Sequence, residues 1–170
     1  MRKLNVLFLL LLIGCSSSKV FYDYDNETNF TSYKSFSFFE DAGEGLNQLD
    51  IKRVKERITK QLEAKGVHYT EKPDIFINFF SKQRESENRN TIGIGIGGGG
   101  NIGFGISGGI PINEKKIVQS LTIDFVEASN NQLIWQGIIE SEFNENYSPY
   151  QKEEYYTKTI TKVLNKYPPK

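Results

Sequence analysis

Large apolar residues recur at odd positions from 117 to 125 and again from 133 to 143, and a period of two fits a β-strand with one buried face but not a helix. The apolar face of the first half carries Ile117, Leu121, Ile123 and Phe125, and that of the second half carries Leu133, Trp135, Ile139 and Phe143. The sequence Ser129-Asn130-Asn131 between the halves favours a turn. The stretch therefore predicts an antiparallel hairpin in which Trp135 belongs to the core rather than to a ligand-binding surface.

Three further segments have the composition of strands. Residues 20–24 (VFYDY) and 33–39 (YKSFSFF) are aromatic, and a turn sequence at residues 26–29 separates them. An apolar run at residues 75–80 follows Pro73-Asp74. This strand is expected to end at Phe80, before the polar residues 81–90.

Two segments have helical spacing. From Asp50 onward, apolar residues recur every three or four positions, at Ile51, Val54, Ile58 and Leu62, and Lys65-Gly66 follows as a stop signal. Ser148-Pro149-Tyr150-Gln151 has the pattern of a capping box with proline at the first helical position. The apolar stripe of this second helix consists of Tyr156, Ile160, Val163, Leu164 and Tyr167.

The order of these elements is strand, strand, helix, strand, glycine-rich hairpin, strand, strand, helix. Two amphipathic helices of this kind bury their apolar stripes against one face of a sheet. The sequence thus predicts an α+β fold, a mostly antiparallel sheet of about five strands with two helices packed on one face. Residues 20–170 would form this single domain, with residues 91–112 as a glycine-rich hairpin insertion.

The first fifteen residues have the features of a secretory signal. Arg2 and Lys3 precede an apolar run at residues 4–13, which is too short to span a bilayer because a spanning helix needs about 20 residues. The residues Leu12-Ile13-Gly14-Cys15 resemble the lipobox of bacterial lipoproteins, in which the cysteine is acylated and becomes the mature N-terminus. The resemblance makes residues 1–14 a signal peptide and residues 15–19 a lipidated tether. The alternative is an ordinary signal peptide with a chance cysteine, although one unpaired thiol is unusual in a secreted protein.

The lipobox resemblance implies a protein that stays on a membrane through acylated Cys15. Each buried methylene group contributes about 0.8 kcal/mol, and two acyl chains already anchor a protein stably. Ser16 rather than aspartate follows the cysteine, and residues 16–19 have no acidic cluster, which favours the outer membrane and its periplasmic face. Basic and acidic side chains number 21 each, so the charge balance indicates no nucleic-acid partner.

The glycine-rich stretch at residues 91–112 contains two motifs associated with chemistry, and both lack the context that they need. G-x-G-x-x-G occurs twice, but a strand follows where a phosphate-binding loop requires a helix. Residues 105–109 match G-x-S-x-G, but the base of that serine should follow it, and the only histidine, His68, comes before it.

The same stretch has the geometry of a hairpin. Isoleucines alternate with glycines at residues 92–96, and the pattern returns at residues 102–106 after a glycine-rich turn. Each leg is shorter than the roughly 9–11 residues of a membrane-spanning strand. One side of the hairpin would then offer apolar contacts to a partner or a lipid surface, at Ile94, Ile96, Phe104 and Ile106. The alternative is a structural or flexible hairpin without a partner.

The titratable residues form no constellation for catalysis or metal binding. His68 stands alone, which excludes the usual zinc spacings. Asp23 and Asp25 share one strand face and could hold a cation, but solvation beside an early turn is the simpler interpretation. Glu140 and Glu142 fall on the polar face of their strand. We therefore expect no cofactor, no metal and no enzymatic activity.

Five short motifs together resemble a known family. They are Asp23-Tyr24-Asp25, Phe30-Thr31-Ser32-Tyr33-Lys34-Ser35-Phe36, Leu62 to Gly66, Pro73-Asp74-Ile75 and Leu133-Ile134-Trp135-Gln136-Gly137. The set is similar to the bacterial envelope lipoprotein family catalogued as domain of unknown function 4136, and it covers nearly the whole mature chain. The resemblance implies an envelope lipoprotein with the α+β fold, and it implies no activity.

These observations predict a membrane-anchored bacterial envelope lipoprotein with a non-enzymatic binding or accessory domain. Its partners would be the membrane, through Cys15, and either an envelope protein or a hydrophobic ligand. One alternative is a subunit of an oligomeric envelope assembly whose hairpins combine into a larger sheet or barrel. Another is a carrier of a hydrophobic ligand. The sequence leaves the oligomeric state open.

Overall fold

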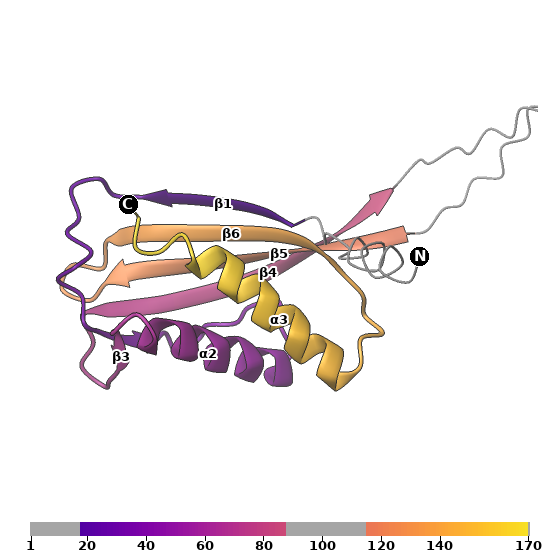
Figure 1. The fold of residues 1–170 in the computed structure, drawn as a ribbon, viewed down its shortest axis with the longest axis horizontal. Coiled ribbons are helices and arrows are strands. Elements are labelled where there is room, and N and C mark those ends of the chain that lie inside the picture. The colour runs from indigo at the N-terminus through magenta and orange to yellow at the C-terminus, as the bar shows by residue number, and fades with distance from the viewer. Residues whose placement is uncertain (1–17, 88–114, 170) are drawn as a thin grey trace, which may run out of the picture.

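The computed structural model describes residues 18–87 and 115–169 of the chain. The elements of this part, drawn in Figure 1, are β1 (Lys19–Tyr24), β2 (Ser35–Phe38), α2 (Gln48–Glu63), β3 (His68–Tyr69), β4 (Ile75–Glu87), β5 (Lys115–Glu127), β6 (Leu133–Phe143) and α3 (Pro149–Leu164). The predicted α+β class is confirmed. Neither described helix is long and apolar enough to cross a membrane.

The strands form one six-stranded mixed sheet in the order β1-β6-β5-β4-β2-β3. The pairs β1–β6, β6–β5 and β5–β4 are antiparallel, as the sequence predicts, whereas β2 pairs in parallel with both β4 and β3. The parallel pairs arise because α2, followed by the short β3, carries the chain back from the end of β2 to the start of β4, and a crossover of this kind connects parallel strands. The expected count of five strands omits β3, which has two residues.

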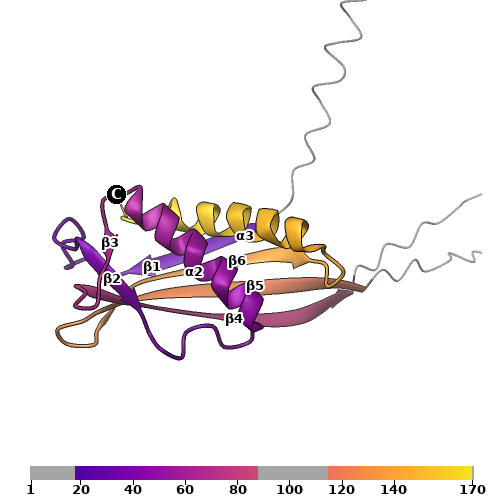
Figure 2. The ribbon, with the colours of Figure 1, turned by 90° about the horizontal axis from the view of Figure 1, so that it is seen from below.

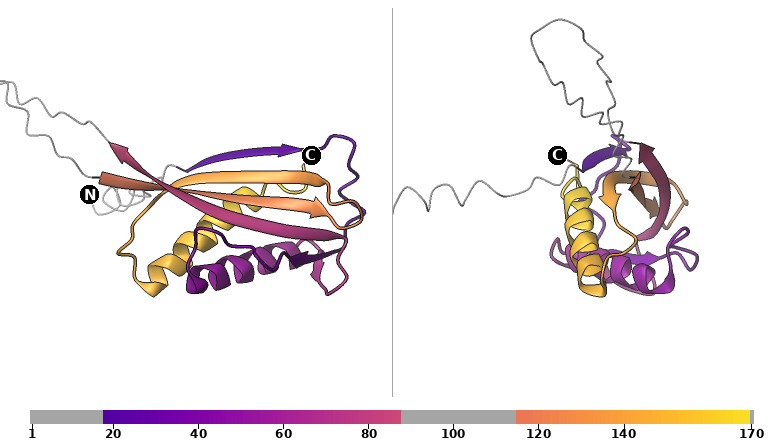
Figure 3. Two further views of the ribbon diagram at one scale, coloured as in Figure 1. Left: turned by 180° about the vertical axis from the view of Figure 1, so that it is seen from behind. Right: turned by 90° about the vertical axis from the view of Figure 1, so that its right-hand side faces the viewer.

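Both helices pack on the same face of the sheet, as predicted, and no described helix covers the other face (Figures 2 and 3). They run in the same direction, because Asp50 contacts Lys152 near their starts and Gln61 donates to Thr161 at 3.1 Å near their ends. The apolar stripe of each helix meets the inner face of the sheet. The largest fully buried side chains there include Phe36, Ile58, Leu62, Ile75, Ile77, Phe79, Leu121, Ile123, Phe125, Trp135 and Tyr156.

The predicted helix signals are found in the structure. Ser148 accepts from the backbone N–H of Gln151 at 3.3 Å, and the Gln151 side chain accepts from the Ser148 N–H at 2.9 Å, which completes the capping box of α3. The start of α2 lies slightly before the expected one, because Asn47 is its N-cap and accepts from the Asp50 N–H at 3.0 Å. Gly66, at φ +79°, follows the end of α2.

The strand β4 is longer than its hydropathy indicates. It continues from the expected end at Phe80 to Glu87, and each residue pairs with β5 as far as Glu87↔Lys115. This extension consists of polar residues, so it shows no alternation that sequence reasoning could detect. Backbone hydrogen bonds to β5 maintain it beyond the part of the sheet that the helices cover.

The predicted inward position of Leu133 is wrong. The pairing of β5 with β6 passes from Phe125↔Trp135 to Val126↔Leu133, so Ile134 is an additional residue on β6. Such a β-bulge reverses the side on which the preceding residues lie. Leu133 is therefore 48% exposed, while Ile134 is 2% exposed and joins the core.

Candidate functional site

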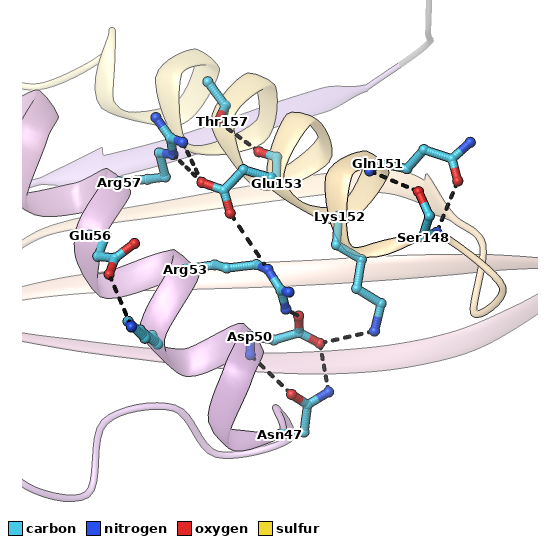
Figure 4. A network of polar contacts seen from close by, with 11 residues as sticks. Asn47, Asp50, Arg53, Glu56, Arg57, Ser148, Gln151, Lys152, Glu153 and Thr157 are labelled. Atoms are coloured by element: carbon cyan, nitrogen blue, oxygen red, sulfur yellow. Dashed lines mark hydrogen bonds and ion pairs between the residues drawn. The ribbon is translucent and has the colours of Figure 1, made fainter.

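A cluster of charged and polar residues joins α2 and α3 near their N-terminal ends (Figure 4). We call it the interhelix cluster and define it as Asn47, Asp50, Arg53, Arg57, Lys152 and Glu153. Its centre is Asp50, which is only 3% exposed. The Asp50 carboxylate accepts from Asn47 at 2.7 Å, from Arg53 at 2.7 Å and from Lys152 at 3.4 Å. Three donors therefore satisfy the oxygens of this buried carboxylate.

The second carboxylate of the cluster, Glu153 on α3, lies between two arginines of α2. The Arg57 guanidinium donates to Glu153 Oε1 through both Nε, at 3.0 Å, and Nη2. Arg53 Nε lies 3.5 Å from Glu153 Oε2. Because Arg53 also contacts Asp50, one guanidinium connects the two carboxylates and fixes the two helices relative to each other.

The inner face of the sheet becomes polar beneath this cluster. Ser81, Gln119 and Ser141 are buried there, and Ser141 Oγ lies 2.6 Å from Tyr155 Oη. The Gln119 amide lies beside the Tyr156 phenol, yet neither Gln119 Oε1 nor Tyr156 Oη reaches a hydrogen-bond partner among the described residues. Burial, and next the charge of Asp50, raise the pKa of Tyr156 above its ordinary value, so its hydroxyl stays protonated.

An open pocket of about 190 Å³ lies between the helix starts and this polar part of the sheet. Asp50, Gln83, Gln119, Glu145 and Lys152 line it. It can hold water or a small polar molecule, because Gln119 supplies a buried acceptor without a partner. Asp50 is a poor general base, because its oxygens already accept from three donors. The arrangement therefore suits structure or binding better than acid–base chemistry.

Sequence reasoning missed the interhelix cluster, although two signals for it are visible. Asp50 continues the apolar stripe of Val54 and Ile58 by one turn, so a carboxylate falls on the buried side of the helix. Gln119 shares a strand face with Ile117 and Leu121, where an alternating pattern calls for an apolar residue. A polar residue at an apolar position indicates a buried polar site.

The carboxylates singled out in the sequence take local roles. Asp25 accepts from the backbone N–H of Glu27 at 3.0 Å and from Thr28 Oγ1 at 2.9 Å, and these bonds lower its pKa. Asp23 accepts from the N–H of Tyr24 at 2.9 Å. This geometry agrees with the turn interpretation. In the part of the chain that the structure describes, no three His, Cys, Asp or Glu side chains gather as a metal site would require.

Other predicted positions are found where expected or lie outside the described residues. Glu140 lies on the face opposite Trp135, as predicted, and contacts Arg84 at 3.2 Å. His68 is exposed in β3. The lipid attachment residue and the candidate partner contacts fall outside the described part of the chain; they are Cys15, Ile94, Ile96, Phe104 and Ile106.

The start of β1 and the long extension of β4 and β5 lie at the same end of the sheet. Through the pairing across β6, Lys19 at the start of β1 lies level with Ser120 and Lys82. From that level β4 and β5 run five residue pairs further, to Glu87↔Lys115. Followed from its end back to its start, β1 points in the same direction as the part of β4 that extends beyond it (Figure 1). The segment before β1 and the segment between β4 and β5 are therefore attached at the same end of the domain.

The architecture is that of an α+β domain with two parallel helices on one face of a mixed sheet. The family model described as Domain of unknown function (DUF4136) matches residues 20–169, and the chain belongs to this family. No curated protein matches the chain.

Solved structures that share the fold include those of two different proteins. A PDZ domain protein from Parabacteroides distasonis has a TM-score of 0.56 and 15% identity over 99% of this chain. The match covers 40% of that protein, so this chain spans less than half of its length. The PelC dodecamer from Paraburkholderia phytofirmans has a TM-score of 0.53 and 10% identity, with 87% of this chain and 95% of that chain covered. At these identities the likeness shows the fold alone.

Proposed function

We propose that this chain is a membrane-anchored, non-enzymatic accessory domain of the bacterial cell envelope, with acylated Cys15 in the outer membrane and the domain in the periplasm. Its glycine-rich segment, residues 91–112, contacts a protein partner or the lipid surface. The observation that carries the proposal is the common attachment of the two segments at one end of the sheet.

The chain lengths keep both segments close to the anchor. Lys19 is four positions after Cys15, so an extended tether reaches at most about 14 Å. The five residue pairs of β4 and β5 beyond Lys82 add about 17 Å in the same direction. Measured along the strands, the last described pair, Glu87↔Lys115, thus lies roughly 3 Å further from Lys19 than the fully extended tether reaches, and the glycine-rich segment follows this pair in the chain. Its isoleucines would have the bilayer or a membrane-bound partner within reach.

Replacing Cys15 by serine should abolish lipidation and leave the precursor unprocessed or mislocalised. Metabolic labelling with a fatty-acid analogue, followed by fractionation of the envelope, measures both effects. Ser16→Ala serves as the matched control, because it changes the neighbouring residue and keeps the acylated thiol. Equal labelling of the wild-type chain and the Cys15→Ser variant would contradict the anchor.

Deleting residues 93–109 and joining the ends through a short turn should leave the melting temperature nearly unchanged and reduce crosslinks to partners in the native envelope. The reason is that the described core closes without this segment. A second variant that replaces Ile94, Ile96, Phe104 and Ile106 by serine keeps the chain length and removes only the apolar side. A deletion that unfolds the domain would show that these side chains belong to the core, and the contact proposal would fail.

The second candidate function is a subunit of an oligomeric envelope assembly. Its support is the fold shared with PelC, which is a dodecamer in the solved structures. Mass photometry of the full chain in detergent separates the candidates, since a ring or large oligomer favours the assembly and a monomer or dimer disfavours it.

A further inference from the structure

The strand β1 forms one edge of the sheet, and within the described residues it pairs only with β6 (Figure 1). The backbone N–H of Asp25 donates to the Ile134 carbonyl at 3.0 Å, in the same register as the β1–β6 pairs. In an antiparallel pair, alternate residues bond to the partner strand and the others point away from it. The odd-numbered residues of β1 therefore bond to β6, and Val20, Tyr22 and Tyr24 direct their N–H and C=O groups to the open edge.

One of these edge groups already has a partner. The N–H of Tyr24 donates to Asp23 Oδ1 at 2.9 Å. The groups left for a new strand are the N–H and C=O of Val20 and Tyr22, together with the carbonyl of Tyr24. From the inner face, the Lys166 ammonium lies 5.7 Å from the centre of the Tyr22 ring, and Lys162 donates to Ser18 at 2.7 Å. These contacts with α3 and the turn after it hold β1 in place and leave its edge open.

We propose that β1 pairs in antiparallel fashion with β1 of a second copy of this chain, with Phe21 opposite Phe21 of the other copy at a two-fold axis. This register places Val20 opposite Tyr22 of the second copy on both sides of the axis. Each of these two pairs exchanges both of its hydrogen bonds, so the register uses all the free groups of Val20 and Tyr22. The two six-stranded sheets would become one continuous sheet with the helices on a common face.

The side chains of β1 are complementary to themselves in this register. Lys19 comes opposite Asp23 of the second copy, and Asp23 comes opposite its Lys19. Both residues are exposed, and neither makes an ion pair with another described residue. Opposite charges that face each other across strands stabilise a pair, and like charges destabilise it. The strand thus carries one cation and one anion at equal distances from Phe21.

The neighbouring registers are less favourable. A shift that places Tyr22 opposite Tyr22 requires the N–H of Tyr24, which Asp23 occupies. A shift in the other direction places Lys19 opposite Phe21 and leaves the charges unpaired. The chosen register also covers two large side chains, since Phe21 is 52% exposed and Tyr22 is 47% exposed. An uncovered edge of this kind is a site for pairing with another strand.

The membrane anchor is compatible with this pair. The two-fold axis stands perpendicular to the joint sheet, so the two Lys19 residues lie at equal distances from the axis. Each four-residue tether can turn towards the same face of the sheet, and both anchors then reach one bilayer that lies parallel to it.

Disulfide crosslinking in membranes of the native host tests the register with the full chain. Phe21→Cys should give a covalent dimer on oxidation, because a residue at the axis in a non-hydrogen-bonded position has its copy about 4.5 Å away between Cα atoms. Lys19→Cys is the matched control. Position 19 lies on the same face of the same strand as position 21. In the proposed register, the two copies of position 19 are offset by four residues along the strands, so the Lys19→Cys chain should stay monomeric. The wild-type chain measures the background of crosslinking through Cys15.

Charge reversal provides the second measurement. In the Phe21→Cys chain, Lys19→Asp turns two attractive pairs into repulsive ones and should lower the dimerisation constant roughly tenfold. The further change Asp23→Lys should restore it. The proposal is overturned by equal crosslinking of Phe21→Cys and Lys19→Cys, by no crosslinking of Phe21→Cys, by its crosslinking to a different protein, or by a failure of the double reversal to restore the dimer. None of these outcomes depends on what the glycine-rich segment contacts.

Discussion

Replacement of Trp135 by alanine should lower the free energy of unfolding by about 3–5 kcal/mol, as removal of a large core side chain does. The Trp135 side chain is 0% exposed. Its ring lies 4.9 Å from that of Phe125 and 5.6 Å from that of Tyr167, measured between centroids. Alanine would leave a cavity at the centre of this aromatic group. A loss of this size corresponds to a fall in melting temperature of roughly 10 °C for a domain of this length.

The matched control is Leu133→Ala, two residues earlier in β6. Because Leu133 is 48% exposed beside the bulge, its truncation should change the free energy of unfolding by less than about 1 kcal/mol. Thermal unfolding by circular dichroism measures both variants under the same conditions. An unchanged melting temperature for Trp135→Ala would place the tryptophan at the surface. A large loss for Leu133→Ala would mean that Leu133 faces inward after all.

The sequence contains the parts of the fold that depend on local patterns. The alternation around Leu121, Ile123 and Phe125 is visible because one face of β5 is buried against the helices and the other is not. The capping box at Ser148 and Gln151 is visible because its two hydrogen bonds connect residues three apart. Patterns of this kind need no knowledge of distant partners.

The features that were missed depend on pairing between distant segments. The bulge at Ile134 is a property of the β5–β6 ladder, and nothing in the residues around it distinguishes Ile134 from Leu133. The polar end of β4 exists because β5 pairs with it, and β3 exists because two residues after α2 come beside β2. The hydropathy pattern reflects side-chain burial. Strands that are held only by backbone hydrogen bonds therefore cannot be recognised from it.

The interhelix cluster could not be predicted from the sequence for the same reason. Asp50 and Lys152 are about a hundred positions apart, and only the packing of α2 beside α3 brings them together. The sequence shows Asp50 as an acidic residue in the first turn of a helix, where its negative charge interacts favourably with the helix dipole. The sequence does not show which basic side chains form ion pairs with Asp50. The partners of a buried charge follow from the crossing of two elements, and that crossing is set by the core beneath them.

Replacement of Gly137 by alanine should destabilise the domain by about 1–3 kcal/mol, the cost of an added group in a packed core. Elsewhere in a strand the same change stabilises, because alanine has the lower entropy cost on folding. The sign is reversed here because a methyl group at position 137 would fall between the Trp135 indole and Val163 of α3. A Cβ at this position would meet the Trp135 indole and would lie 2.6 Å from Cγ2 of Val163. The glycine two residues after Trp135 therefore leaves room for the indole to lie beneath α3.

A double-mutant cycle with Val163→Ala isolates this contact. Truncation of Val163 removes one of the two obstacles, so Gly137→Ala should cost less in the Val163→Ala background than in the wild-type chain. Urea unfolding of the four chains yields the coupling free energy directly. A melting temperature that rises in Gly137→Ala would mean that α3 can move away at no cost. In that event the short spacing between Trp135 and Gly137 would have another cause than the packing of the indole under the helix.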